Sequence, residues 1–415
     1  MQIYFRISIL VFLISIFQIY AFGGGIGKIG DKTILKNVKH KILVLEYDSP
    51  TDKTWGKDIS QMIAQEILGT MFGVNNMGVV HLEQNEDSLV KYTPENINTI
   101  SNQQEVLLTI WGEFYTEGND VYIYSHLRII PREDFPAEAF GLSLEMESDR
   151  SILRAEPATL QLNFKPIKLS IETLKSMHEF YNKTIQIRKD PNSNSNIIKD
   201  LVPGDTYFVL RRENEWMKIG TRGGVIGWIK YENLEEQNEL GEVGSVITMA
   251  QAILQYMAGN YNASTSSLEH YTESNIGQDP LNRCFSHILF GNSIIYQNKY
   301  TRRIPDNEKV SEQYQRALEI MPYNSSAINH LAIVTIFRDF HKGRESYWSF
   351  TEVEGLLIHI IKTENNVNAI GNLEALYKVA GDFGNLYNDN NPNDYQGLIR
   401  ERLNILGDLK VRQHR

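Results

Sequence analysis

The chain has 415 residues, 42% of them hydrophobic and 22% charged, and its formal net charge at pH 7 is −10. At one domain per roughly 100–200 residues, this length corresponds to about two to four domains. The acidic balance argues against a nucleic-acid-binding surface, because such a surface needs clustered lysine and arginine.

The first 21 residues have the features of a secretory signal peptide. Arg6 is their only charge, and residues 7–20 are mostly apolar. This run is short for a membrane span, which needs roughly 20 residues, and Ala21 offers a small residue at the cleavage point. An uncleaved N-terminal membrane anchor is the alternative. Residues 22–37 begin with a glycine-rich run and predict a flexible tether.

Residues 38–168 predict a mixed α/β domain. The expected elements are a strand at 41–47, a helix at 55–72, and strands at 78–82, 106–115, 121–130, 142–146 and 159–164. A five-residue hairpin loop at 116–120 contains Gly118. A strand, a helix and a further strand, followed by a meander, indicate a layered α/β fold.

Three features of this domain resemble the envelope α/β domains of the FlgO, CsgG and TolB amino-terminal type. They are the opening strand at 42–47, the helix at 59–72, and the strand at 107–115 with its glycine-containing hairpin. The resemblance implies a role in assembly or scaffolding in the cell envelope. It carries over no catalytic residues.

Residues 181–235 predict a small, self-contained β barrel. Short β-rich runs at 184–188, 206–211, 216–220 and 225–230 alternate with turns at 190–193, 203–205, 212–215 and 222–224. A unit of this size has little core. Trp216 and Trp228 therefore matter greatly, since each can bury on the order of 150–250 Å².

Four motifs in this region resemble the bacterial SH3 (SH3b) family. They read Ile187-Arg188-Lys189-Asp190-Pro191, Pro203-Gly204-Asp205, Asn214-Glu215-Trp216-Met217-Lys218-Ile219 and Gly224-Val225-Ile226-Gly227-Trp228-Ile229. The resemblance implies a ligand-binding or protein-binding module, sometimes for peptidoglycan, without an active site. The expected contact residues are Trp216, Trp228, Tyr207 and Tyr231. The alternative is that both tryptophans belong to the barrel core.

Residues 243–415 predict an α-helical array. Apolar residues at helical spacing extend over 246–257, 263–271, 281–296, 309–321, 325–337, 350–362, 367–386 and 395–406. Helix pairs in tandem bury a continuous core by stacking. Residues 314–324, with Ala317 at a close-packing position and Pro322 after the helix, resemble the end of a tetratricopeptide repeat. This resemblance implies a partner-binding surface, and an unrelated α bundle is the alternative.

Reactive side chains are sparse. Cys284 is the single cysteine, so no intramolecular disulfide and no cysteine-rich metal site can form. His287 lies one helical turn from it, which suggests a nucleophile pair, but a buried structural cysteine is the preferred interpretation. Asp48, Asp52 and Asp58 lack the glycine and the bidentate glutamate of a calcium loop. We therefore expect no catalytic residues, no metal and no cofactor.

The predicted fold is multi-domain α+β, with an N-terminal mixed α/β domain, a small SH3-like β barrel and a C-terminal helical array. The expected function is non-enzymatic binding or scaffolding in the bacterial cell envelope. Its partners would be envelope proteins or peptidoglycan, with no nucleic acid and no small-molecule cofactor. We expect a secreted or periplasmic location. The alternative function is a cell-wall hydrolase, or its accessory subunit, that the SH3b module would target.

Overall fold

The computed structural model describes residues 39–50, 55–70, 77–82, 93–145, 152–181, 183–202, 207–221, 224–230, 244–273, 279–298, 308–342, 347–387, 401–402, 404 and 406–407. The expected signal peptide (1–21), the expected tether (22–37) and Tyr231 lie outside these residues. Among the described residues, no helix combines the length and the apolar character that a membrane span requires.

The chain divides into two compact units. The first, which we call the sheet unit, consists of Met1–Ile130 and Pro166–Ile247. The second, which we call the helical unit, consists of Pro131–Lys165 and Thr248–Arg415. This grouping differs from the three predicted domains, because the SH3-like region joins the α/β region and residues 131–165 join the helices.

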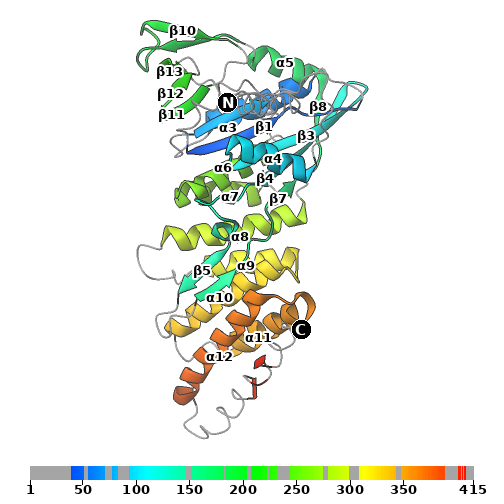
Figure 1. The fold of residues 1–415 in the computed structure, drawn as a ribbon, viewed down its shortest axis with the longest axis vertical. Coiled ribbons are helices and arrows are strands. Elements are labelled where there is room, and N and C mark those ends of the chain that lie inside the picture. Colours follow the sequence, from blue (N-terminus) through cyan, green and yellow to red (C-terminus); the bar gives the residue numbers. More distant parts are fainter. Residues whose placement is uncertain are drawn as a thin grey trace, which may run out of the picture. The chain divides into compact units, whose positions relative to one another are not determined.

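The α/β part of the sheet unit is built on a mixed sheet (Figure 1). Its strands are β1 (His40–Leu45), β2 (Met77–Leu82), β3 (Leu108–Glu117), β4 (Asp120–Ile129) and β8 (Ile167–Ser170). β1 pairs in parallel with β2 and β3, whereas β3, β4 and β8 pair antiparallel in that order. Mixed α/β architecture is therefore confirmed for this part of the chain.

The β3–β4 hairpin is tighter than the predicted five-residue loop. Glu117 pairs directly with Asp120, which leaves only Gly118 and Asn119 in the turn. Gly118 has a φ of 61°, a left-handed conformation that glycine adopts without a steric cost. The turn therefore holds the two long strands in fixed register.

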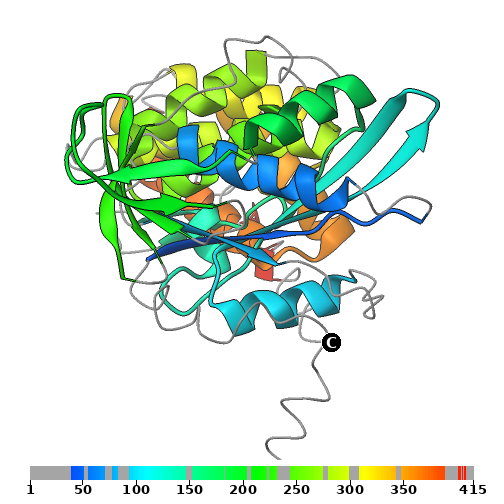
Figure 2. The same cartoon turned by 90° about the horizontal axis from the view of Figure 1, so that it is seen from above.

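Three helices cover the two faces of this sheet. They are α3 (Gly56–Thr70), α4 (Pro94–Gln104) and α5 (Ile171–Tyr181). Figure 2 shows α3 and α5 on one side of the sheet and α4 on the other. Strand β1 is buried along its whole length, as expected for a strand covered on both faces.

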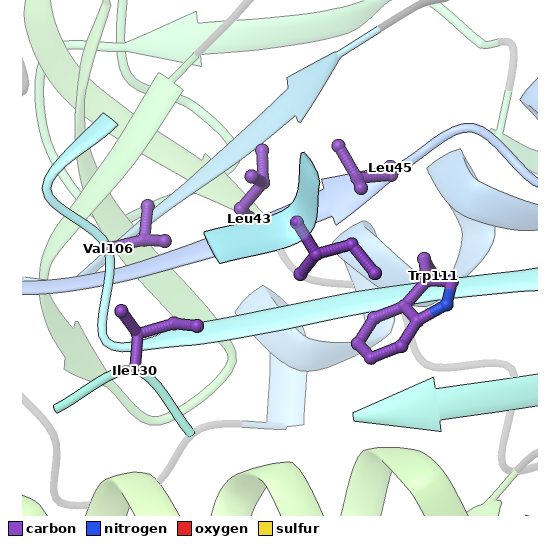
Figure 3. Packing of buried hydrophobic residues seen from close by; sticks show 6 residues of the cluster. Leu43, Leu45, Val106, Trp111 and Ile130 are labelled. Carbon is purple, nitrogen blue, oxygen red and sulfur yellow. The ribbon is translucent and has the colours of Figure 1, made fainter. Parts of the chain in front are cut away.

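The core on the α4 side joins β1 to β3 (Figure 3). It contains the buried residues Leu43, Leu45, Ile97, Val106, Trp111 and Ile130. The hydroxyl groups of Ser101 on α4 and Thr109 on β3 lie 2.6 Å apart within the buried layer. This bond satisfies two buried polar groups that would otherwise destabilise the fold.

The SH3-like strands continue the same sheet. They are β9 (Ile185–Arg188), β10 (Ile197–Leu201), β11 (Tyr207–Glu213), β12 (Trp216–Thr221) and β13 (Ile226–Lys230), in the spatial order β10-β9-β13-β12-β11. Strand β11 then pairs antiparallel with β2.

These strands agree with the predicted SH3-like fold, whereas the prediction that the barrel is self-contained is wrong. The backbone groups on one edge of β11 pair with β2, the edge strand of the α/β part, so each sheet covers an edge of the other. Tyr207, at the start of β11, is buried. Burial raises the pKa of its phenol, and the nearby Glu66 of α3 raises it further.

The helical unit confirms the predicted C-terminal helical array. Its helices are α6 (Gly244–Met257, which belongs to this unit from Thr248 on), α7 (Tyr261–Glu273), α8 (Pro280–Gln297), α9 (Glu308–Ile320), α10 (Ser325–Lys342), α11 (Tyr347–Glu364) and α12 (Val367–Tyr387). From α7 to α12 each helix packs on the next one in sequence, and α10 also packs on α8 and α12. Gly259, with a φ of 76°, ends α6 and allows the turn into α7.

Residues 131–165 form the extended part of the helical unit. They contain the 3₁₀ helix η1 (Ala137–Phe140) and strands β5 (Leu142–Glu145), β6 (Ile152–Ala155) and β7 (Gln161–Asn163). β5 and β6 form a two-stranded antiparallel ribbon. β6 packs against α10 and α12, and β7 packs against α8.

Candidate functional site

The expected contact residues of the SH3-like region are buried. Trp216 is 6% exposed, Trp228 5% and Tyr207 9%. Side chains with so little free surface cannot form a binding platform by themselves. The arrangement agrees with the alternative that both tryptophans stabilise the core of this small β unit.

Strand register places a row of basic side chains beside Trp228. Arg211 on β11 lies opposite Lys218 on β12, and Lys218 lies opposite Trp228 on β13. Trp228 in turn lies opposite Arg188 on β9. Residues directly opposite one another in a sheet project from the same face. We call these four residues the Trp228 row.

Two cations of the row lie over the indole ring. The guanidinium carbon of Arg211 is 5.1 Å from the ring centroid of Trp228, and the ammonium nitrogen of Lys218 is 5.8 Å from it. Such contacts contribute roughly 0.5–1 kcal/mol each at exposed sites. The two side chains are thereby held above a ring that is itself almost fully covered.

Hydrogen bonds and an ion pair orient the remaining charges. Arg188 donates to the backbone oxygen of Ser195 at 2.8 Å and to Oε1 of Gln186 at 2.7 Å. Arg211 forms an ion pair with Glu213 at 2.7 Å. Both partners of this pair are about half exposed, so it contributes little to stability. Its main effect is to fix the direction of the guanidinium group.

Exposed apolar side chains lie on the same face. Ile226 is two residues before Trp228 on β13, and it is 57% exposed. Ile197 on β10 lies opposite Arg188, and it is 49% exposed. The Trp228 row with these two isoleucines therefore presents fixed cations beside free apolar surface. This combination suits a ligand that carries carboxylates and short aliphatic groups.

The Cys284–His287 pair lacks the properties of a nucleophile and its base. Cys284 is fully buried in α8, and burial raises the pKa of its thiol to about 12. The thiol is therefore protonated at neutral pH, whereas catalysis needs the thiolate. His287 is also buried, and its Nδ1 lies 2.8 Å from Oε1 of Gln313. The buried location agrees with the preferred interpretation of this cysteine as structural.

The three aspartates considered for a cation site do not cluster among the described residues. Asp58 Oδ1 lies 2.7 Å from Nδ1 of His178. Asp48 forms an isolated backbone bridge with Glu113. Asp52 lies outside the described residues. In the part of the chain that the structure describes, no group of three or more His, Cys, Asp or Glu side chains could hold a metal ion.

Residues 183–235 match the family described as bacterial SH3 domain. These residues are a bacterial SH3 domain. The match covers β9–β13 and well under half of the chain, so it identifies this domain and leaves the rest of the protein unassigned.

No curated protein matches the chain. Among solved structures, one similar chain is that of a PelC dodecamer from Paraburkholderia phytofirmans that carries a single leucine-to-methionine substitution. It is 9% identical and covers 34% of this chain and 84% of its own, with a TM-score of 0.17. The resemblances to tetratricopeptide repeats and to envelope α/β domains remain predictions.

Sequence reasoning missed the residues that surround Trp228. The SH3b motifs contain Arg188, Lys218 and Ile226 without marking them as contact residues, and Arg211 lies outside the motifs. Arg211 lies seven residues before Lys218 in the sequence. Only the strand register brings the two together, and the bulge in the β11–β12 pairing makes that register hard to foresee. The alternation around Trp228 could have identified Ile226.

Proposed function

We propose that the protein is a non-enzymatic binding protein of the bacterial cell envelope, and that its SH3 domain contacts peptidoglycan. The match of residues 183–235 to the bacterial SH3 domain supports this proposal, since domains of this family commonly bind peptidoglycan or proteins. The expected signal peptide at residues 1–21 supports an extracytoplasmic location. The helical unit would supply a protein-binding surface.

Within the SH3 domain, we propose that the Trp228 row is the surface that contacts peptidoglycan. Peptidoglycan stem peptides carry free carboxylates and small aliphatic side chains. Arg211 and Lys218 provide fixed positive charges, and Ile226 provides apolar surface beside them. A charged contact of this kind is worth roughly 1.5–3 kcal/mol, enough to be measured by a single substitution.

Sedimentation of the full chain with purified sacculi tests the proposal. Lys218→Glu should weaken binding roughly tenfold, because it replaces an attraction to carboxylates by a repulsion. Lys175→Glu is the matched control, since Lys175 is an exposed lysine on α5 outside the SH3 domain.

Three results would contradict the proposal. The unmodified chain could stay in the supernatant, the two variants could bind equally well, or the chain could clear cell walls in a zymogram. The last result would favour the hydrolase alternative, which needs a catalytic group other than the buried Cys284.

A further inference from the structure

The helical unit holds part of its own chain by a repeated set of contacts. Helices α6, α8, α10 and α12 each donate a hydrogen bond to a residue within 139–145 or 152–163. Each of these four bonds ends on a backbone carbonyl oxygen. We call the described residues 139–145 and 152–163 the internal segment, and the polar side chains that hold it the amide face. The amide face consists of Tyr256, Asn282, Asn292, Ser326, Asn329, Asn366, Asn368 and Asn372.

Two asparagines of the amide face each form two hydrogen bonds with one residue of the internal segment, one to its backbone N–H and one to its carbonyl oxygen. Asn372 accepts from the backbone N–H of Arg154 at 3.2 Å and donates to its carbonyl at 2.9 Å. Asn282 accepts from the backbone N–H of Asn163 at 3.3 Å and donates to its carbonyl at 2.8 Å. A carboxamide that pairs in this way completes the hydrogen bonding of an extended residue as a neighbouring strand would.

Further bonds follow the internal segment between and beyond these two points. The phenol of Tyr256 donates to the carbonyl of Ala139 at 3.0 Å. Asn292 donates to the carbonyls of Phe140 and Gly141 at 3.2 and 3.3 Å. The hydroxyl of Ser326 donates to the carbonyl of Glu156 at 2.6 Å. Contacts to backbone atoms fix the path of a segment without selecting its side chains.

One side chain of the internal segment, the carboxylate of Glu156, is also bound by the amide face. The side chain of Glu156 accepts from the amide groups of Asn329, Asn366 and Asn368. Asn366 lies just before α12, and its own side-chain oxygen accepts from the backbone N–H of Ala369 in the first turn of that helix. A negative charge at this position is also favoured by the dipole of α12.

Strand β6 adds an apolar pattern to this carboxylate. Leu153 and Ala155 are buried, at 0% and 5% exposure, whereas Ile152 is 50% exposed and Arg154 is exposed. The retained pattern is therefore a large apolar residue, any residue, a small apolar residue and glutamate. Asn282, Asn292 and Asn372 are at most 1% exposed, so this part of the amide face is buried, whereas Asn366 and Asn368 beside Glu156 are partly exposed.

We propose that the amide face is a peptide-binding surface, that the internal segment occupies it as an internal ligand, and that an extended acidic segment of a partner protein binds by replacing β6 and Glu156. The partner segment has the pattern large apolar, any residue, small apolar, glutamate. The internal segment competes strongly, because its covalent tether gives it a high effective concentration. Partner binding is consequently regulated by release of the internal segment. This inference is independent of the SH3 domain.

Fluorescence anisotropy with the full chain tests the proposal. The probe is a labelled synthetic peptide with the sequence of residues 151–165. The Leu153→Ala/Glu156→Ala variant, which we call the opened variant, weakens the contacts of the internal segment with the amide face. We expect it to bind the probe at least about tenfold more tightly than the unmodified chain. Ile152→Ala is the matched control on the exposed side of β6, and it should bind like the unmodified chain. Adding Asn372→Ala to the opened variant should reverse the gain.

Hydrogen exchange of the unmodified chain provides a second measurement that needs no variant. If the internal segment is a releasable ligand, the amides of Arg154 and Asn163 exchange before the helical amides around Leu289 in α8. Simultaneous exchange of both sets would overturn the proposal, since the segment would then be an inseparable part of the array.

Two further results would also overturn it. One is an opened variant with native circular dichroism that binds the probe no better than the Ile152→Ala control. The other is an opened variant that forms concentration-dependent dimers without the probe, because the amide face would then be occupied by the segment of a second copy.

Discussion

His330 shows how burial sets the chemistry of a single residue in this protein. It is fully buried on α10, with Nδ1 2.7 Å from the backbone oxygen of Ser326 and Nε2 3.3 Å from Nδ2 of Asn292. The ring of Tyr314 lies 5.2 Å away. Burial lowers the pKa of His330 from 6.5 to about 4, although Glu156 and the Ser326 carbonyl act in the opposite direction.

This shift predicts the direction of a pH dependence. Between pH 6.5 and 4 the unfolded chain binds a proton at this position and the folded chain does not. The contribution of the neutral His330 ring to the free energy of unfolding is therefore complete above pH 6.5. It is lost as the pH falls towards 4, by up to roughly 3 kcal/mol. Urea denaturation at pH 8 and pH 5 should show a smaller loss for His330→Gln than for the unmodified chain.

An equal loss in both proteins would contradict the shift at His330. His287 needs a parallel variant, because burial also lowers its pKa and it therefore acts in the same direction.

Trp216 and Trp228 show which part of the candidate site could be predicted from the sequence. The motifs around Trp216 and Trp228 identified the SH3 domain correctly, because turn residues and large aromatics are local signals. They did not identify the exposed residues. Whether a tryptophan is covered depends on side chains from other strands, and here Arg211 and Lys218 lie over Trp228.

At the scale of elements, the pairing of β11 with β2 couples the SH3 domain to the α/β part. Leu45→Ala should weaken the core between β1 and α4 by roughly 2–5 kcal/mol. We expect hydrogen exchange to accelerate at the amides of β12 as well as β1, because the strands belong to one continuous sheet.

Tyr115→Ala is the matched control for this prediction, since Tyr115 on β3 is 41% exposed. If Leu45→Ala accelerates exchange in β1 and leaves β12 unchanged, the SH3 domain unfolds independently and the continuous sheet has no energetic consequence.

Most elements with strong apolar periodicity were predicted close to their observed bounds, including β1, α3 and the helices from α6 to α12. The sequence did not predict α4, because its residues Pro94–Gln104 are mostly polar and only Ile97 and Ile100 face the core. β10 was missed for a related reason, since its first four residues are all exposed. Weak burial leaves a weak pattern, even where the backbone pairing is regular.

In the whole molecule, the boundaries of the two compact units depend on hydrogen bonding between distant residues as well as on local composition. Residues 131–165 follow directly on β4 and read as part of the same meander. Their buried backbone groups are satisfied by Asn282, Asn292 and Asn372, which lie more than a hundred residues later. Single asparagines in helices give no signal of such pairing, so the two units could not be predicted from the sequence.

We propose that this protein acts by binding, through the SH3 domain and its Trp228 row. The most direct test is an NMR titration of the full chain, labelled with ¹⁵N at its five tryptophan indoles, with soluble peptidoglycan fragments. We expect a shift of the Trp228 indole resonance, because Arg211 and Lys218 lie over that ring, and no shift of the buried Trp111 in the α/β core. An unchanged Trp228 resonance at saturating fragment concentration would contradict it.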